Sequence, residues 1–404
     1  MTAQPQPLSI IIIGAGIGGL ATALGLLAEN HTVLILEKSK FANEVGAALA
    51  LPSNLTNPLS KLCLNPDDFG ANREDFRTFY TKDGHLMFEQ DLRSVPARLV
   101  HRVDFHEALR VAAVNRGAEI RLGSQVMSVE PEAGTVTISS GEVFTADAII
   151  GADGIHSVVR KHVVPDAPEP SPFLRSMFRM LIPCARLSAA SPETRAFLDP
   201  PGKMSIFTSD DGRRTVCYPC RENTVMNVGA LFPTTWVREY DTVEEIKEHM
   251  IRIFADFHPS PRALLAAAED PSLWILYDLP ALETWSCGRT AIMGDAAHPT
   301  LPFAAQGGAQ ALEDAVTLAV VLRKGTRADQ VQDRLRLFHE IRRERCKWIQ
   351  DFARGADQST PENPGVPPTI DPAEFFEKVH RHDACAFAEQ KLEEYLRAKG
   401  EQLS

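Results

Sequence analysis

The N-terminal part of the chain contains two short runs of branched apolar residues, separated by a stretch rich in glycine and alanine. The runs from Leu8 to Ile13 and from Thr32 to Leu36 have the length and composition of parallel strands that are buried on both faces. Between them, the small apolar residues from about Gly18 to Asn30 favour a buried helix. The pattern therefore predicts a strand–helix–strand unit close to the N-terminus.

Two kinds of pattern alternate further along the chain. From about Pro165 to Pro280, prolines separate stretches such as Met177 to Pro183 and Thr215 to Leu231, in which apolar and polar residues alternate. This region is predicted to form an antiparallel sheet with a few helices. Outside it, helices are expected at 105–116, 309–323 and 331–353, and strands at 118–129, 135–139, 143–150 and 290–293.

Composition limits the classes of partner. The 404 residues are 44% hydrophobic and 24% charged, as in a globular protein with a large core. Because 42 basic residues stand against 53 acidic ones, the net charge is −11, and no basic surplus is available for nucleic acid or an anionic membrane. Seven cysteines are an odd number, and neither a signal peptide nor a membrane span is visible. We therefore expect reduced thiols and a cytoplasmic protein.

The turn after the first predicted strand has the residues of a dinucleotide-binding site. Gly14, Gly16 and Gly19 have the spacing GxGxxG between a strand and a helix, which permits a tight turn and a close approach to a pyrophosphate. The helix N-terminus adds N–H groups and the positive end of its dipole. Glu37 ends the second strand, where a carboxylate can accept hydrogen bonds from a ribose. Glycines that only shape the turn are the alternative, but the residues together favour FAD or NAD.

Two later segments select FAD. The sequences GADG at 151–154 and GDAAH at 294–298 each follow a predicted buried strand. Asp295 can accept hydrogen bonds from a ribityl chain, and a helix that starts near Gly307 can direct its N-terminus at the flavin N1–C2=O edge. In this order, the three glycine-containing segments resemble the signatures of the single-component FAD-dependent aromatic hydroxylases.

This resemblance covers most of the chain and is greatest to salicylate 1-monooxygenases and 6-hydroxynicotinate 3-monooxygenases. The segments 45–54, 100–104, 178–183 and 217–221 are similar to four further motifs of that family. It implies non-covalently bound FAD. The predicted cofactor-binding residues are Gly14, Ala15, Gly16, Ile17, Gly18, Gly19, Glu37, Lys38, Ala48, Arg102, Asp153, Gly154, Asp295, Pro302, Gly307, Gly308 and Ala309.

For the activity, the resemblance implies a monooxygenase that uses NADH or NADPH and molecular oxygen. It would hydroxylate a small aromatic compound through a flavin C4a-hydroperoxide, and an ortho carboxylate would allow decarboxylation. A phenol, a salicylate-like compound or a hydroxypyridine is expected as substrate. A homodimer is compatible with the sequence, and neither a nucleic acid nor a membrane is expected as a partner.

Arg179 and Tyr218 are the predicted catalytic residues, on two strands that the resemblance directs at the substrate. The arginine would stabilise an anionic ring, and the tyrosine would donate a hydrogen bond or transfer a proton. For Arg179, an ion pair on the outer face of the sheet is the alternative. Ala50, Asn227 and Phe303 are expected to line the substrate pocket.

No metal site is predicted. Cys217 and Cys220 have CxxC spacing, but in a strand a separation of three places them on opposite faces, and no second ligand pair follows. His298, after the GDAA turn, fits a structural hydrogen bond better than a catalytic base. A GxSxG, HExxH or P-loop sequence is absent, which excludes the hydrolases, metalloproteases and kinases that use them.

The expected fold class is α/β, with a Rossmann-type FAD-binding domain, an inserted α+β substrate domain with an antiparallel sheet, and C-terminal helices. The FAD-binding domain is expected at 1–165, with an excursion into the substrate domain near 76–100, and again at 281–354. The substrate domain is expected at 166–280. A linker and a charged, solvent-facing helical tail would occupy 355–404.

Two other functions stay open. One is a flavin-dependent oxidase or dehydrogenase of a secondary metabolite on the same fold. The other is a non-catalytic flavin-binding scaffold, which the unusual residues Ala48 and Phe303 would allow and the intact GADG segment argues against.

Overall fold

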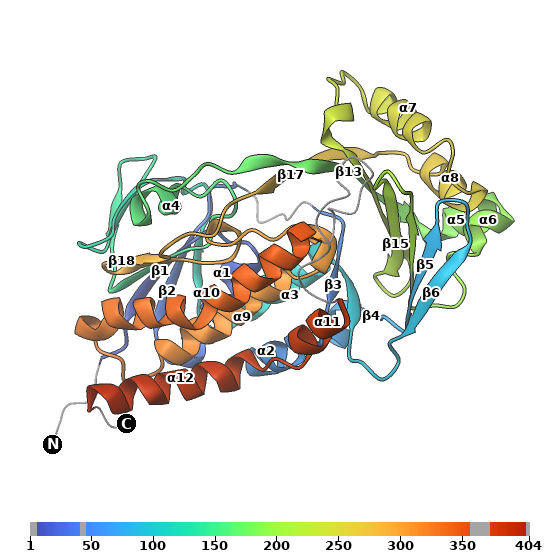
Figure 1. The fold of residues 1–404 in the computed structure, drawn as a ribbon. Helices are drawn as coiled ribbons and strands as arrows, with labels where there is room; N and C mark the ends of the chain where they lie inside the picture. The colour runs from blue at the N-terminus through green and yellow to red at the C-terminus, as the bar shows by residue number, and fades with distance from the viewer. Residues whose placement is uncertain (1–5, 41–45, 356–371, 401–404) are drawn as a thin grey trace.

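The computed structural model describes residues 6–40, 46–355 and 372–400 of the chain. Figure 1 shows two parts side by side, a layered α/β part that contains the N-terminus and a second part built on a largely antiparallel sheet. Strands β13 (Ser171–Pro183) and β17 (Ser272–Asp278) extend from the first part into the second. The predicted fold class is confirmed, whereas the domain boundaries stay predictions.

The first part contains a six-stranded sheet in the order β18-β19-β12-β1-β2-β8. Neighbouring strands are parallel, except that the edge strand β18 is antiparallel to β19. Because the carboxyl ends of parallel strands meet at one edge, the loops after β1, β12 and β19 lie close together. The strands are β1 (Ser9–Ile13), β2 (Thr32–Leu36), β8 (Glu119–Arg121), β12 (Ala148–Gly151), β18 (Ser286–Cys287) and β19 (Thr290–Ile292).

Helices cover this sheet and share one apolar core with it. Helix α1 (Ile17–Ala28) contacts α3 (Arg102–Asn115) and α9 (Gly307–Val321). Helix α9 also contacts α10 (Val331–Gly355) and α12 (Ala384–Lys399). The shorter helices are α2 (Thr56–Lys61), α4 (Val158–Val163), α5 (Cys184–Ala190), α6 (Pro192–Arg195), α7 (Val243–Ile253), α8 (Pro259–Ala266) and α11 (Pro372–His380).

The second part contains a seven-stranded sheet in the order β17-β13-β16-β15-β14-β5-β6. One face packs on α5, α7 and α8 through an apolar cluster that includes Cys217. Cys220 belongs to a different cluster, which confirms that the two cysteines point to opposite faces. The added strands are β5 (Phe76–Thr81), β6 (Leu86–Asp91), β14 (Lys203–Thr208), β15 (Arg214–Cys220) and β16 (Val225–Pro233).

Two three-stranded sheets complete the architecture. In one, β3 (Ala48–Leu51), β7 (Arg98–His101) and β4 (Asn72–Arg73) lie between the two parts (Figure 1). The other contains β9 (Val126–Glu130), β10 (Thr135–Ile138) and β11 (Val143–Thr145). The first of these sheets matters for function, because it brings β3 against the seven-stranded sheet.

Two predictions about secondary structure were wrong. The run 143–150 forms two strands, because Asp147 turns the chain and accepts hydrogen bonds from the N–H and hydroxyl of Ser9 at the start of β1. The C-terminal tail is not solvent-facing, since Ala388, Leu392 and Leu396 of α12 are buried in the main core. Most of the predicted linker, 355–371, lies outside the described residues.

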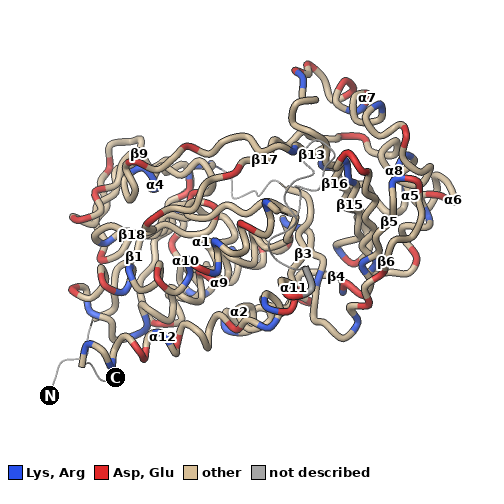
Figure 2. Tube along the Cα trace, viewed as in Figure 1, with Lys and Arg blue, Asp and Glu red and all other residues tan. Residues whose placement is uncertain are grey.

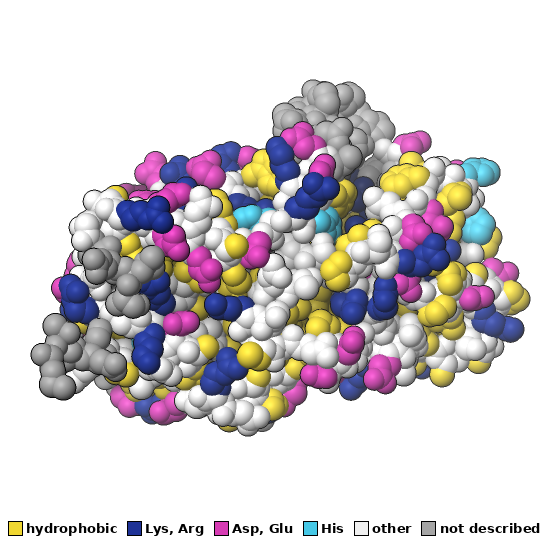
Figure 3. Space-filling model, turned by 90° about the horizontal axis from the view of Figure 1, so that it is seen from below, with side chains coloured by type: hydrophobic (Ala, Val, Ile, Leu, Met, Phe, Trp, Pro, Cys, Tyr) yellow, Lys and Arg dark blue, Asp and Glu magenta, His cyan; other side chains and the backbone are white. Residues whose placement is uncertain are grey.

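Charges are distributed over both parts of the molecule. Figure 2 shows acidic and basic residues interspersed along the chain, and the same mixture covers the face drawn in Figure 3. Among the helices in the described ranges, none combines the length and the hydropathy needed to cross a bilayer.

Candidate active site

The turn between β1 and α1 depends on three glycines in three different ways. Gly14 has a φ of +103°, and a Cβ there would lie 2.5 Å from the carbonyl oxygen of Ala152. A Cβ on Gly19 would lie 2.0 Å from the carbonyl oxygen of Gly14, so the helix packs directly against the turn. A Cβ on Gly16 would meet no atom within 4 Å. Gly16 therefore borders open space, while the other two glycines permit close packing of the backbone.

The start of α1 is suited to an anion. Its N-cap, Gly16, provides no side-chain hydrogen bond, and the first turn contains no acidic residue. The first N–H groups of a helix have no partner within the helix, and the helix dipole places positive charge there. The open space at Gly16 and this positive helix end together fit a pyrophosphate.

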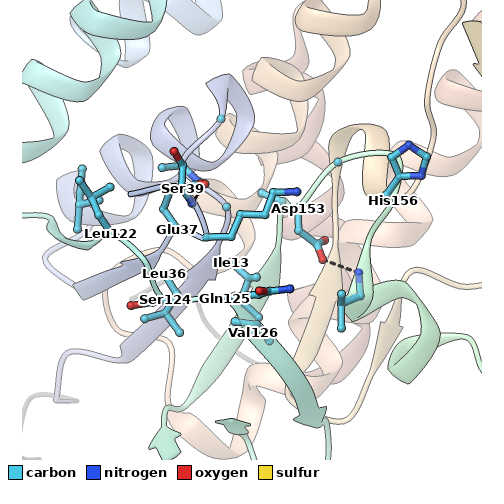
Figure 4. Close-up of a pocket in the computed structure, with 18 of the residues that line it drawn as sticks. Ile13, Leu36, Glu37, Ser39, Leu122, Ser124, Gln125, Val126, Asp153 and His156 are labelled. Atoms are coloured by element: carbon cyan, nitrogen blue, oxygen red, sulfur yellow. Dashed lines mark hydrogen bonds between the residues drawn. The ribbon is translucent and has the colours of Figure 1, made fainter. Parts of the chain in front are cut away.

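A pocket of about 550 Å³ opens beside the turn. Figure 4 shows Glu37 and Asp153 on its walls, together with residues from the ends of β1 and β2. Glu37 Oε2 accepts a hydrogen bond of 2.8 Å from the N–H of Ala15, and Oε1 accepts one of 2.8 Å from the N–H of Ser39. Glu37 thus fixes the turn, and its carboxylate retains lone pairs for a ribose hydroxyl.

Asp153 has one oxygen bound to the protein and one without a hydrogen-bond partner. Oδ2 accepts hydrogen bonds from the N–H groups of Val158, at 2.7 Å, and Val159, at 3.2 Å, at the start of α4. Oδ1 is buried and has no partner. Burial raises the pKa of this carboxyl group. A buried oxygen without a partner is costly, so its place on the pocket wall fits a ligand hydroxyl as donor.

Asp295 occupies a short 3₁₀ turn, η4 (Gly294–Ala296), that follows β19. Its side chain is exposed although its neighbours Gly294 and Ala296 are buried. Desolvation by the surrounding protein raises the pKa of Asp295, and the charges of His298 and Arg102 act in the opposite direction. An exposed carboxylate that protein surrounds on most sides lines a hollow, as a ribityl-binding group would.

The start of α9 lies against strand β3. A Cβ on Gly308 would be 3.9 Å from Leu49 Cδ1, and the loop before α9 contains the 3₁₀ turn η5 (Pro302–Ala304). Helix α9 has no side-chain cap and no acidic residue in its first turn. Its N-terminal N–H groups are therefore suited to the negative charge that develops at N1–C2=O of a reduced flavin.

One face of the seven-stranded sheet is directed at β3. Tyr218 is paired with Asn227, and Arg179 with Gly229, so the three side chains share a face. Asn227 Oδ1 accepts a hydrogen bond of 3.0 Å from the N–H of Ala48, and Arg179 Nη2 donates to the carbonyl oxygen of Ala48 at 3.5 Å. Both residues thus attach β3 to the sheet.

Arg179 has an aromatic neighbour and no carboxylate partner among the described residues. Its Cζ lies 4.8 Å from the ring centroid of Trp274. Trp274 Nε1 donates to Ser272 Oγ at 3.1 Å, and Ser272 Oγ donates to the carbonyl oxygen of Arg179 at 3.2 Å. Burial lowers the pKa of Arg179. A desolvated cation of this kind favours an anionic ligand beside it.

Comparison with known proteins identifies the family. The family model for an FAD binding domain matches residues 8–353. Hispidin-3-hydroxylase of Neonothopanus nambi is 32% identical, with 98% of this chain and 99% of that protein aligned. A 3-hydroxybenzoate 6-hydroxylase of Klebsiella oxytoca is 31% identical over 77% of this chain and 79% of that protein. The fold is similar to that of a salicylate hydroxylase substrate complex, with a TM-score of 0.79, 24% identity, and 95% and 98% of the two chains covered.

The chain belongs to the FAD-dependent aromatic hydroxylases. It is thus an FAD-dependent monooxygenase, and the predicted family and cofactor are confirmed. The individual site residues are not tested by these comparisons, so the contacts that each would make with FAD stay predictions.

The structure gathers the predicted flavin residues of this hydroxylase into two groups. The first lines the pocket in Figure 4, and the second surrounds the start of α9, β3 and Asp295. Ile17, Gly19 and Ala309 are buried, so they pack beneath these surfaces. The first group is Gly14, Ala15, Gly16, Glu37, Lys38, Asp153 and Gly154.

The predicted substrate residues are less alike than the sequence suggested. Ala50 and Tyr218 contact the same apolar cluster, as expected for one pocket. Asn227 already binds the backbone of Ala48, and Phe303 contacts an aromatic cluster that includes Phe173, at a centroid distance of 6.1 Å. Their roles at the substrate stay predictions.

Several pocket residues were missed from the sequence. Ser39, His106, Arg110 and Gln125 line the pocket beside Glu37. His106 and Arg110 are one helical turn apart on α3, and His106 Nε2 donates to the carbonyl oxygen of Ala15 at 2.7 Å. Their spacing on one helix face was a usable signal. Trp274 lies 95 residues from Arg179 along the chain and offered no local signal.

We expect Asp295→Ala to weaken FAD binding by about ten- to hundredfold, the cost of a lost charge-assisted hydrogen bond. Titration of the apoprotein with FAD, followed by flavin fluorescence, measures the change. Asp295→Asn keeps an acceptor without the charge, and an intermediate affinity is expected. Unchanged affinity in Asp295→Ala would mean that the ribityl chain lies elsewhere.

Proposed function

We propose that this hydroxylase uses NADH or NADPH and molecular oxygen to hydroxylate a small aromatic ring that carries a phenolate or a carboxylate. The observation that carries the proposal is Arg179, a buried cation that has no carboxylate partner among the described residues. It lies on the sheet face that also holds Tyr218 and is directed at β3.

FAD would supply the electrons and the activation of oxygen when bound. The chain's own residues have three tasks. Gly16 and the start of α1 would bind the pyrophosphate, and Asp295 and the start of α9 would hold the ribityl chain and the flavin ring. Arg179 would bind and orient the anionic ring, while the apolar cluster around Ala50 and Tyr218 would exclude water.

The names of the relatives support an oxygenated aromatic substrate. One relative is a 3-hydroxybenzoate 6-hydroxylase and another a hispidin-3-hydroxylase. Phenols, salicylates and hydroxypyridines are therefore suitable candidates, and an ortho carboxylate would allow loss of carbon dioxide. A cytoplasmic location, a homodimer and the predicted domain division belong to the same proposal.

The proposal is tested by following NADH and NADPH oxidation with a panel of these compounds, with peroxide measured as uncoupled turnover. A hydroxylated product and a substrate-dependent rate support it. Stoichiometric peroxide with every compound that is oxidised would indicate an oxidase instead. Slow oxidation that no compound stimulates would indicate a flavin-binding scaffold.

Tyr218→Phe separates two roles for the hydroxyl group. Burial raises the pKa of Tyr218 above its ordinary value, and Arg179 acts in the opposite direction, so the phenol stays protonated at neutral pH. If the hydroxyl relays the substrate proton, the variant's rate will fall at neutral pH and recover at high pH, where the substrate ionises without help. A fall that is equal at every pH would mean that Tyr218 only positions the substrate.

A further inference from the structure

Two adjacent carboxylates on α9, Glu313 and Asp314, are fully buried. Burying an ionised carboxylate is costly unless cations and hydrogen-bond donors surround it. Arg342 of α10 binds both, with Nη1 at 2.6 Å from Glu313 Oε2 and Nε at 2.7 Å from Asp314 Oδ1. Arg345 adds a second cation, its Nε 2.7 Å from Glu313 Oε2.

Asp314 also binds the turn that carries Asp295. Its Oδ2 accepts a hydrogen bond of 2.9 Å from the N–H of Gly294 and lies 2.6 Å from His298 Nε2. Burial alone would raise the pKa of Asp314, but His298 and Arg342 hold it below its ordinary value. Asp314 in turn raises the pKa of His298 well above its ordinary value. The two ends of the GDAAH segment are therefore held by one ionised carboxylate.

Glu313 binds the segment after β3. Its Oε1 accepts a hydrogen bond of 2.7 Å from Asn54 Nδ2, and the same amide group donates to Gln306 Oε1 at 3.1 Å. Gln306 is the N-cap residue of α9, and Asn54 follows β3 in the 3₁₀ turn η1 (Ser53–Leu55). Glu313 thus links β3 to the start of α9.

A metal ion is a poor alternative for this cluster. His298, Asp314 and Cys346 have ligand atoms within 4.8 Å of one another. Both oxygens of Asp314 already accept hydrogen bonds, and Arg342 Nη2 lies 3.5 Å from Cys346 Sγ. A metal cation would be repelled by the guanidinium groups in this low-dielectric environment.

We propose that the Glu313–Asp314 pair positions the elements that hold the flavin, namely the turn with Asp295, the start of α9 and strand β3. The proposal rests on the predicted placement of the flavin at these elements. The two carboxylates and His298 are positioning residues, because they act through Gly294, Asn54 and Gln306. The buried ion network thus fixes the flavin site before FAD binds, which lowers the conformational cost of binding.

The test measures FAD affinity and apoprotein stability in the same set of variants. Asp314→Asn keeps the side-chain shape and removes the charge, and His298→Ala removes one partner of Asp314 with less risk to folding. We expect both to raise the Kd for FAD by about tenfold or more, as lost charge-assisted contacts would. His298→Gln restores a donor and should recover part of the affinity.

Arg213→Gln is the matched control. Arg213 is a largely buried arginine in the second part, paired with Asp211 and Asp256, and it contacts none of the flavin elements. This variant should lower the Tm of the apoprotein and leave the Kd for FAD unchanged. If Asp314→Asn and His298→Ala behave in the same way, or if Asp314→Asn does not fold and His298→Ala keeps its affinity, the positioning role is wrong.

Asp295→Ala, measured in parallel, separates this proposal from the flavin placement. Loss of affinity in Asp295→Ala but not in His298→Ala or Asp314→Asn overturns the role of the carboxylate pair alone. Normal affinity in Asp295→Ala overturns the flavin placement, and the role of the pair falls with it.

Discussion

Replacing Arg179 by alanine is expected to lower substrate-stimulated NAD(P)H oxidation by about two orders of magnitude, the usual cost of one preorganised charge at a reacting group. The reason is that the guanidinium is held over Trp274 and lacks a carboxylate partner among the described residues, so its charge is available to the substrate. FAD binding and the Tm should change little, because no ion pair to a described residue is lost.

Two further variants make this test specific. Arg179→Lys keeps the charge but not the planar group that stacks on Trp274, and an intermediate rate is expected. Arg186→Ala removes an exposed arginine of the same part that is paired with Glu269, and it should leave the rate unchanged. Normal turnover in Arg179→Ala, or loss of the fold, would assign Arg179 to the scaffold.

Replacing Gly16 by valine is expected to weaken FAD binding by more than about a hundredfold, or roughly 3 kcal/mol, while the apoprotein stays folded. The φ of Gly16 is −71°, which any residue adopts, and a Cβ there meets no protein atom within 4 Å. The branched side chain would therefore fill the space of the pyrophosphate without disturbing the protein.

Gly19→Ala is the contrasting change, because its Cβ would lie 2.0 Å from the backbone oxygen of Gly14. That variant should lose thermal stability as well as FAD affinity. Measuring Tm and Kd for both variants distinguishes a blocked site from a damaged fold. An unaltered Kd for FAD in Gly16→Val would place the pyrophosphate away from this turn.

Local sequence was sufficient for the parts of the fold that local chemistry decides. The apolar run Leu8–Ile13 and the glycines after it predicted β1, the turn and the start of α1. The buried run 143–150 was predicted as one strand, because its pattern cannot show that β11 pairs with β10 and β12 with β1. Which strand pairs with which depends on contacts between distant segments.

The C-terminal helix shows how charge can conceal a buried face. Ala384, Ala388, Leu392 and Leu396 recur every four residues and are buried, but the many charged residues between them suggested a solvent-facing tail. A repeat of apolar residues at this spacing is the stronger signal, since charged residues occupy the opposite face of an amphipathic helix.

The candidate site was predictable where a motif acts through its own backbone, and not where it depends on distant partners. The glycine segments place Gly16, Asp153 and Asp295 at adjoining strand ends, as the motifs predicted. The hydrogen bond from Gly294 to Asp314 and the stacking of Arg179 on Trp274 join residues far apart in the chain. Only the folded structure shows them.

The most direct test of the proposed function is the fate of molecular oxygen. The purified enzyme with FAD, NADH or NADPH, and an aromatic compound that stimulates the oxidation would be supplied with ¹⁸O₂, and the product analysed by mass spectrometry. We predict one ¹⁸O atom in the product for each hydroxylation, and loss of this product in Arg179→Ala. An oxidised product without ¹⁸O, formed with an equal amount of labelled peroxide, would contradict a monooxygenase.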